Sequence, residues 1–176
     1  MMQKPWIPTA LLIAFASAGT AMAQGPEHVA SHTDWNVFVA ENPKECYIAS
    51  QPSNSDARRN GQSVEVRRGA IQLYVSYRPS DSVSNEVSFT GGYPFDPSKP
   101  VKLRVGSTEY NMTPGTGEAG EWAWTDASDD ANAVEAMRGG ATAVLTGVST
   151  RGTTTIDEFS LMGFTAAISD AQSRCN

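Results

Sequence analysis

The last quarter of the chain, residues 149–175, constrains the fold more than any other segment. It begins with a glycine turn and a threonine-rich strand, continues as an amphipathic helix and ends on a cysteine. With Ser160 as its N-cap, this helix repeats apolar residues at the three- and four-residue spacing of one face. They are Leu161, Phe164, Ile168, Ala171 and Cys175. The only other cysteine is Cys46, so a bond between the two would fasten the last helix to a segment near the start of the chain.

The first 23 residues have the pattern of a cleaved secretory signal. Lys4 supplies the positive charge, the apolar run from Ile7 to Ala18 is too short to span a bilayer, and residues 21–23 form a small-x-small cleavage site. Gln24 follows, where a lipoprotein would have a cysteine. We expect cleavage near Ala23 and export to the periplasm, the outer envelope or the medium, with no integral membrane segment in the product.

If the protein is exported, its two cysteines are expected to be oxidised to a disulfide. An oxidising compartment favours a disulfide, and two cysteines allow a single connectivity, Cys46 to Cys175. A metal site or a catalytic thiol are the alternatives, but two cysteines cannot complete a tetrahedral site and no histidine lies near either one in sequence. We predict a structural disulfide, with the last helix sealing one end or face of the domain.

The charge balance bears on the choice of partner. Removal of the signal takes away Lys4 and leaves 12 basic and 19 acidic side chains, a net charge of −7. Such an acidic surface argues against nucleic acid and anionic membranes as main partners. The pairs Arg58-Arg59 and Arg67-Arg68 are local exceptions, which we interpret as solvated residues of loops and strand ends.

Short alternating segments dominate the remainder of the chain and predict strands. They cover residues 35–39, 45–49, 70–77, 85–89, 101–105, 108–112, 121–125, 141–148 and 153–159. The segments 101–105 and 108–112, on either side of Gly106-Ser107, are the best hairpin candidate. A short helix is expected from the caps Asp129 and Asp130 to Met137, ended by Gly139-Gly140. Residues 24–34 are polar and predict a flexible lead-in to a single domain over 35–176. The whole pattern predicts a mainly β, antiparallel β-sandwich with a short helix and a C-terminal amphipathic helix.

The residues that usually carry catalysis do not assemble in this sequence. Ser149 misses the G-x-S-x-G pattern, and both histidines, His28 and His32, fall in the predicted flexible lead-in. The acidic run 126–130 lacks the glycine and the distal glutamate of a calcium loop. We predict no enzyme, no cofactor and no metal site.

Three aromatic residues and one arginine are the candidates for binding. Trp122 and Trp124 share one face of a strand, and Tyr93 lies in a turn-rich loop. Burial in the core is the first interpretation of these rings, and an exposed patch for a protein or glycan is the second. Arg151, in a glycine turn, is expected to anchor its loop by bonding backbone carbonyls or Asp157, with ligand recognition as the alternative.

The chain resembles the invasion-associated locus B family of exported alphaproteobacterial proteins. The matching residues run through most of the predicted domain in a fixed order. They are Trp35, Cys46, Gly92-Tyr-Pro-Phe95, Ala123-Trp124, Ala136-Met-Arg-Gly139, Ser149-Thr-Arg-Gly-Thr153, Phe159-Ser-Leu-Met-Gly163, Ala166-Ala167 and Cys175. The resemblance implies an immunoglobulin-like β-sandwich in the periplasm or outer envelope, in a family of which some members are associated with entry into host cells. It brings no catalytic residues.

Taken together, the sequence predicts an exported, non-enzymatic envelope protein that acts by protein-protein contacts, supporting the envelope or meeting a host surface. The alternative is a periplasmic module for a small ligand or glycan, using Trp122, Trp124, Tyr93 and Arg151. A third possibility is a modulator of another periplasmic enzyme.

Overall fold

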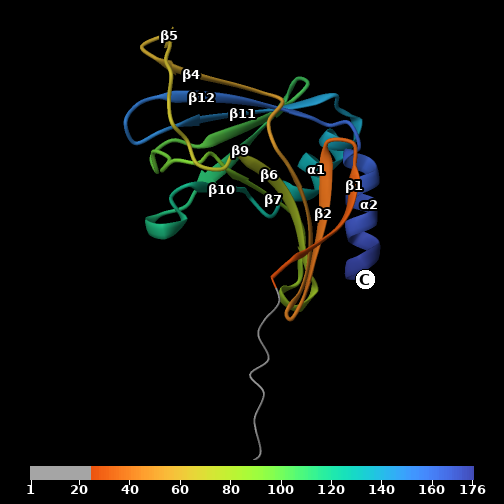
Figure 1. Cartoon of the computed structure of the whole chain (residues 1–176). Helices are drawn as coiled ribbons and strands as arrows, with labels where there is room; N and C mark the ends of the chain where they lie inside the picture. The colour runs from red at the N-terminus through yellow and green to blue at the C-terminus, as the bar shows by residue number, and fades with distance from the viewer. Residues whose placement is uncertain (1–24) are drawn as a thin grey trace, which may run out of the picture.

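The computed structural model describes residues 25–176, which consist mainly of antiparallel strands (Figure 1). Alternating apolar residues form the buried faces of strands such as Trp35–Glu41, Val101–Val105 and Thr142–Val148. The predicted signal over residues 1–23 and its cleavage site lie outside the described residues. No helix within residues 25–176 is long and apolar enough to cross a membrane.

The described strands are short, as the alternation of the sequence predicted. In chain order they are β1 (Glu27–His32), β2 (Trp35–Glu41), β3 (Lys44–Ser50), β4 (Asn54–Arg59), β5 (Gln62–Ser63), β6 (Gln72–Arg78), β7 (Val83–Thr90), β8 (Val101–Val105), β9 (Thr108–Pro114), β10 (Trp122–Thr125), β11 (Thr142–Val148) and β12 (Thr154–Ser160). Two single-turn 3-10 helices follow β6 and β9, at Pro79–Asp81 and Gly117–Ala119. The predicted hairpin around Gly106 is confirmed as β8 and β9, where Val105 pairs with Thr108.

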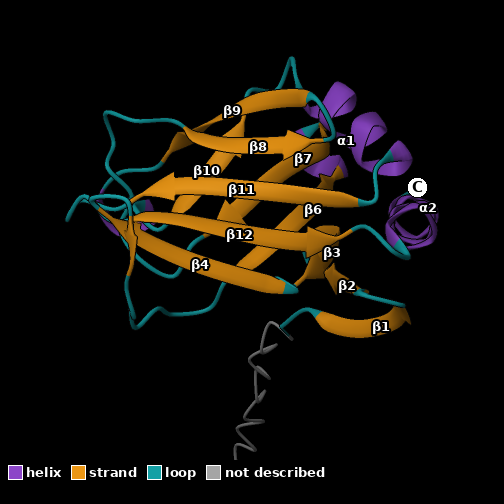
Figure 2. Cartoon of the chain, turned by 90° about the horizontal axis from the view of Figure 1, so that it is seen from above, coloured by secondary structure: helices purple, strands orange, loops and turns teal. Residues whose placement is uncertain are grey.

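Antiparallel hydrogen bonds join the described strands in the order β1-β2-β3-β6-β7-β10-β9-β8-β11-β12-β4-β5. This series folds over on itself, so that β4, β8, β11 and β12 lie as one layer across β6, β7 and β10 (Figure 2). Phe89 of β7 meets Phe159 of β12 edge to face, with ring centroids 6.1 Å apart. The mainly β, antiparallel prediction is confirmed. The two layers are halves of one hydrogen-bonded series, whereas an immunoglobulin-like sandwich has two separate sheets.

The last helix, α2 (Phe164–Cys175), packs against β2 and β3 and against the shorter helix α1 (Asp130–Gly139). Its buried residues are Phe164, Ala167, Ile168 and Ala171, and the ring of Phe164 meets Trp35 edge to face. The indole nitrogen of Trp35 donates a hydrogen bond to the carbonyl oxygen of Ser160 at 3.0 Å. As predicted, the helix seals one part of the core.

The predicted disulfide is present. Cys46, fully buried on β3, is bonded to Cys175 in the last turn of α2, with the two Cα atoms 5.8 Å apart. The bond closes a loop across 129 residues and ties the end of the chain to an inner strand.

The start of α2 differs from the prediction. Ser160 is not the N-cap but the last residue of β12, where its hydroxyl oxygen accepts a hydrogen bond from the amide of Met162. The helix begins after Gly163, whose φ of 88° and close approach to the carbonyl of His32 leave no room for a Cβ. The tight turn that brings α2 onto β1 therefore replaces the expected side-chain cap.

The polar lead-in predicted over residues 24–34 is not a flexible segment where the structure describes it. Residues 27–32 form β1, which pairs with β2 from Glu27 opposite Val39 to His32 opposite Trp35. His32 also contacts Asp170 of α2, with Nε2 3.0 Å from the carboxylate. Backbone pairing and this contact order a segment whose side chains are too polar to reveal a strand.

The caps predicted for α1 are also placed differently. Asp129 is the N-cap residue but makes no side-chain capping bond, and the helix ends at Gly139 as expected. Asp130 points inward, where its carboxylate accepts hydrogen bonds from the amide of Val87 and the hydroxyl of Thr125. Burial in the interior raises the pKa of Asp130. The side chain thus joins α1 to β7 and β10 instead of capping the helix.

Candidate functional site

The four predicted binding residues line two different cavities. Tyr93 and Arg151 border a cavity of about 490 Å³ that we call the arginine cavity, because Arg59, Arg67, Arg68 and Arg151 line it. Trp122 and Trp124 border a shallower groove of about 650 Å³ on the outer side of β3, β6, β7 and β10. The structure therefore divides the four residues, which the sequence predicted as one binding site, between two separate sites.

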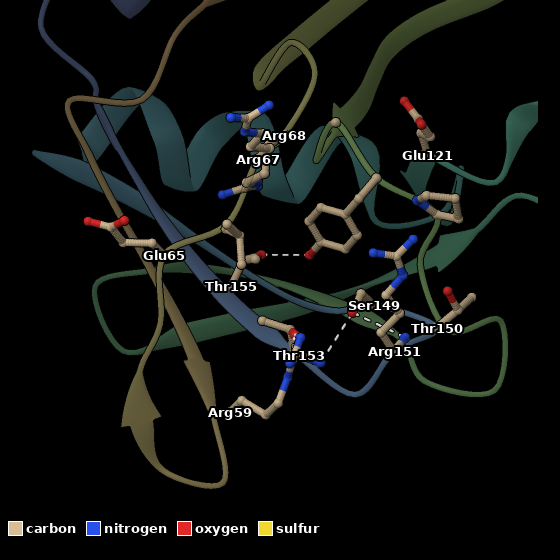
Figure 3. A pocket seen from close by; sticks show the side chains of 14 residues that line it. Arg59, Glu65, Arg67, Arg68, Glu121, Ser149, Thr150, Arg151, Thr153 and Thr155 are labelled. Carbon is tan, nitrogen blue, oxygen red and sulfur yellow. Dashed lines mark hydrogen bonds between the residues drawn. The ribbon is translucent and has the colours of Figure 1, made fainter.

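Two regions that are distant in sequence, residues 59–68 and 149–155, bring the arginines of this cavity together (Figure 3). Arg59 comes from the end of β4, Arg67 and Arg68 from the connection between β5 and β6, and Arg151 from the turn between β11 and β12. Tyr93, in the loop between β7 and β8, and Thr155 of β12 also line this cavity.

A buried ion pair forms the inner wall of the arginine cavity. The guanidinium of Arg68, with 8% of its side chain exposed, donates to both carboxylate oxygens of the fully buried Asp157, at 2.7 and 2.6 Å. The Nε of Arg68 donates to the carbonyl of Gly91, and the guanidinium carbon lies 5.1 Å from the centre of the Tyr93 ring. Arg68 is therefore not the solvated residue predicted from its sequence context, and Asp157 is bonded by Arg68, not by Arg151.

The hydroxyl of Tyr93 is held by the same wall. It lies 2.6 Å from the hydroxyl of Thr155, and burial raises the pKa of Tyr93 to about 12. Since one of these two hydroxyls donates to the other, the second retains a proton that can be donated elsewhere.

Two glycines fix the distance between the walls. The amide of Gly69 donates to the carbonyl of Gly92 at 2.9 Å, and a Cβ on Gly92 would lie 2.7 Å from the backbone of Gly69. Gly92 also has a φ of +70°, which favours glycine. The close approach of the two backbones brings Arg67 and Arg68 beside the loop that carries Tyr93.

The turn that carries Arg151 is fastened at several points. The hydroxyl oxygen of Ser149 accepts hydrogen bonds from the amides of Arg151 and Thr153, and the amide of Thr150 donates to the carbonyl of Pro94. Ser149 is thus a turn-forming residue. Within residues 25–176 the exposed guanidinium of Arg151 forms no hydrogen bond or ion pair, so the predicted anchoring contacts to backbone carbonyls or Asp157 are absent, and ligand recognition by this side chain stays a prediction.

Unpaired positive charge is concentrated at the arginine cavity. Within the described residues, only four basic side chains have no carboxylate within 4.0 Å. They are Arg59, Arg67, Arg104 and Arg151, and all except Arg104 line this cavity. Glu65 and Glu121 also line it, on opposite sides of the view in Figure 3.

The second surface is a row of aromatic rings, which we call the aromatic face. Adjacent rings lie 5.0 to 6.2 Å apart between centroids and cross the strands β1, β2, β3, β6 and β10. The row consists of His28, Phe38, Tyr47, Tyr74, Trp122 and Trp124. The rings are half-buried or exposed, whereas the neighbours of Trp124 along β10, Ala123 and Thr125, are buried. The tryptophans therefore do not belong to the core, so the first interpretation is wrong for them, and their use as a patch for a protein or glycan stays a prediction.

Pairing register explains why the rings line up. His28 is opposite Phe38, Phe38 is opposite Tyr47, and Trp124 is opposite Ser88, which is opposite Tyr74. Side chains directly opposite on antiparallel strands lie on the same face of a sheet, so one outward position on each strand extends the row. Partial burial among the rings raises the pKa of Tyr47 and of Tyr74.

Charged residues flank the aromatic face. Arg78 of β6 lies between Glu45 and Glu86, with guanidinium nitrogens 3.5 and 2.8 Å from the respective carboxylates. Glu118 also borders the groove. These groups give the surface an apolar centre with a polar margin.

The described histidines do not assemble a catalytic or metal site. His28 contacts Ser31 and His32 contacts Asp170, and no group of three potential metal ligands occurs within residues 25–176. The arrangement of the two cavities is suited to binding through hydrogen-bond donors and aromatic surfaces.

Five further residues on these two surfaces were not predicted as binding candidates from the sequence: Arg59, Arg67, Phe38, Tyr47 and Tyr74. For Tyr47 and Tyr74 a signal existed, because each alternates with buried residues of its strand and so had to point outward. The convergence of the arginines had no such local signal.

The fold and its surfaces define a disulfide-closed, antiparallel β protein with a sealing C-terminal helix and two surfaces suited to binding. The family model described as "Invasion associated locus B (IalB) protein" matches residues 35–172, and the chain belongs to this family. No curated protein and no solved structure matches the chain.

Proposed function

We propose that this protein is an exported, non-enzymatic protein of the cell envelope that acts by protein-protein contacts, and that its aromatic face makes the contact. Export is supported by the signal pattern of residues 1–23 and by the disulfide, which is typical of oxidising compartments. The observation that carries the contact is the row of six aromatic rings on the outer side of the sheet.

The dimensions of the row favour a protein partner. It reaches across six neighbouring strands, from β1 to β10 through β7, and strands are spaced at about 4.8 Å, so it extends over roughly 24 Å. Interface centres are rich in Trp, Tyr and Phe and are surrounded by polar residues, as this row is by Glu45, Arg78 and Glu86. A small ligand would use only part of such a surface.

A glycan is the second candidate, and it is favoured by one observation. The rings of Trp122 and Trp124 are stacked 6.2 Å apart beside the groove, a flat aromatic surface on which a sugar ring can lie.

Site-specific photo-crosslinking in intact cells tests the proposal. A photoreactive residue at Tyr47 or Trp124 is expected to capture the same protein, while one at Lys102, exposed on β8 in the other layer, is expected not to capture it. The substitution Tyr74→Ser should abolish capture from the Trp124 position. Capture that is equal from all three positions, or none from Tyr47 and Trp124, would contradict a protein contact at this face, and saturable binding of a neutral oligosaccharide there would favour the glycan.

The two remaining parts of the proposal need separate measurements. Cell fractionation should find the chain, shortened by cleavage near Ala23, outside the cytoplasm. Hydrolysis of peptidoglycan, peptide or ester substrates by the purified protein at a useful rate would refute the non-enzymatic role.

A further inference from the structure

We infer that the arginine cavity is a binding site for a small hydroxylated anion, a sugar phosphate or a sugar carboxylate. This inference is independent of the proposed function, because it rests on a different cavity, built from the turns between β5 and β6, β7 and β8, and β11 and β12. Its volume of about 490 Å³ lies in the range of sites for small molecules.

The charge distribution supports an anion. The chain without its signal has a net charge of −7, yet three of the four described basic side chains that lack a carboxylate partner line this one cavity. They are Arg59, Arg67 and Arg151. Like charges brought together with no carboxylate within 4.0 Å repel one another, so an anionic ligand that bonds to their guanidinium groups would relieve this repulsion.

The hydrogen-bonding groups of the wall also favour an acceptor ligand. Ser149, 9% exposed, uses its oxygen to accept from two backbone amides, and its hydroxyl proton has no acceptor within residues 25–176. Tyr93 and Thr155 share one hydrogen bond, which leaves one further hydroxyl proton. Phosphate and carboxylate groups only accept hydrogen bonds, and they match this excess of donors.

The margin of the cavity favours hydroxyl groups on the ligand. Glu65 and Glu121 line opposite sides of the cavity, and a ligand hydroxyl that reaches either carboxylate can donate a hydrogen bond to it. The exposed hydroxyl of Thr150 can donate a hydrogen bond to a ligand hydroxyl or accept one from it. A purely anionic ligand would be repelled by the two glutamates, whereas a sugar can direct its charged group to the arginines and its hydroxyls to the sides.

The site is prepared before any ligand arrives. Arg68 is fixed by Asp157 and Gly91, the turn of Arg151 is bonded to Pro94, and the Gly69–Gly92 contact sets the separation of the walls. Since little ordering of the backbone is then needed on binding, the backbone part of the entropic cost of binding is small.

Calorimetric titration of the purified protein with glucose 6-phosphate, glucuronate and neutral glucose tests the inference. Saturable binding of one of the two anions with a stoichiometry of one is expected, together with at least tenfold weaker binding of glucose. The anion that binds more tightly identifies the charged group. Absence of saturable binding for both anions, or equal affinity for glucose, would overturn the inference.

Substitutions locate the binding. Arg151→Gln and Arg67→Gln each remove a charged donor and should weaken binding of the anion about tenfold or more, the usual effect of losing a hydrogen bond to a charged group. Arg104→Gln is the matched control, because Arg104 is exposed and has no carboxylate partner but lies on β8, outside the cavity. Equal weakening in the control would show general attraction to the surface and overturn the assignment. Tyr47→Ser on the aromatic face should leave this binding unchanged, which separates the failure of this inference from failure of the proposed function.

Discussion

Arg68 and Asp157, 89 positions apart in the chain, form a bidentate ion pair in the interior, with nitrogen-oxygen distances of 2.7 and 2.6 Å. The pair links the connection before β6 to β12 and forms the wall behind Tyr93. Removal of one partner from a buried pair is costly, because the other charge then stays in the interior without compensation.

Asp157→Asn is therefore expected to lower the free energy of unfolding by about 3–5 kcal/mol, as measured by urea denaturation. The double variant Arg68→Met/Asp157→Leu should recover much of this loss, since it buries no charge. Glu109→Gln, which breaks the exposed pair with Lys102, is the control and should change stability little. A loss no greater than that of the control would show that the buried pair is unimportant for stability.

Cys175→Ser should lower the melting temperature under oxidising conditions. The bond to Cys46 closes a loop across 129 residues. On the chain-entropy model, closing a loop of that length stabilises the folded state by about 5 kcal/mol, because it removes conformational entropy from the unfolded chain. Reductant should lower the melting temperature of the unaltered protein by a similar amount and leave the variant unchanged. An equal melting temperature for the two proteins without reductant would contradict a stabilising role.

Asp130 should make the stability depend on pH. Burial raises its pKa above the usual 3.8, so the folded protein holds this proton more tightly than the unfolded chain does. The protonated Asp130 carboxyl therefore stabilises the folded state fully at pH values below the unfolded pKa, and this stabilisation is lost as the pH rises through the folded pKa. Asp130→Asn keeps an oxygen that accepts from Val87 and Thr125 but has no charge, so it should gain stability relative to the natural protein between pH 4 and pH 7.

Asp130→Ala separates the hydrogen bonds from the charge. It lacks the acceptor and should be less stable than Asp130→Asn at every pH, in thermal denaturation followed by circular dichroism. A constant difference between Asp130→Asn and the natural protein across pH 4 to 7 would refute the assigned shift.

Gly92→Ala should destabilise the protein more than Gly152→Ala. Both glycines have positive φ values, +70° and +77°, so the cost of the backbone conformation, about 1–2 kcal/mol, is shared. Only at Gly92 would the new Cβ collide with the backbone of Gly69, at 2.7 Å, whereas nothing lies within 4 Å at Gly152. The difference between the two unfolding free energies measures the collision, and equal losses would show that Gly69 can move away.

The sequence was sufficient for features that depend on local pattern. The alternation over residues 101–112 predicted the β8–β9 hairpin, the spacing from Phe164 to Ala171 predicted the buried face of α2, and a single possible pairing predicted the disulfide. Local pattern failed at β1, where the polar side chains of residues 27–32 hide a strand that is held by backbone pairing with β2. It failed again at Ser160, which pairs with Thr142 as the end of β12, and at Asp130, which accepts hydrogen bonds from Val87 and Thr125 instead of capping the helix.

By itself, then, the sequence determined a mainly β, disulfide-closed domain and its family, since periodicity and cysteine count act through short-range geometry and chain connectivity. Only the tertiary structure decided where the candidate binding residues lie. The rings of the aromatic face are aligned by the register of strands far apart in the chain, and Arg59 and Arg67 meet Arg151 because the segment from β4 to β6 lies beside the turn between β11 and β12. Such proximity follows from how the sheet folds over on itself, and no local spacing in the sequence encodes it.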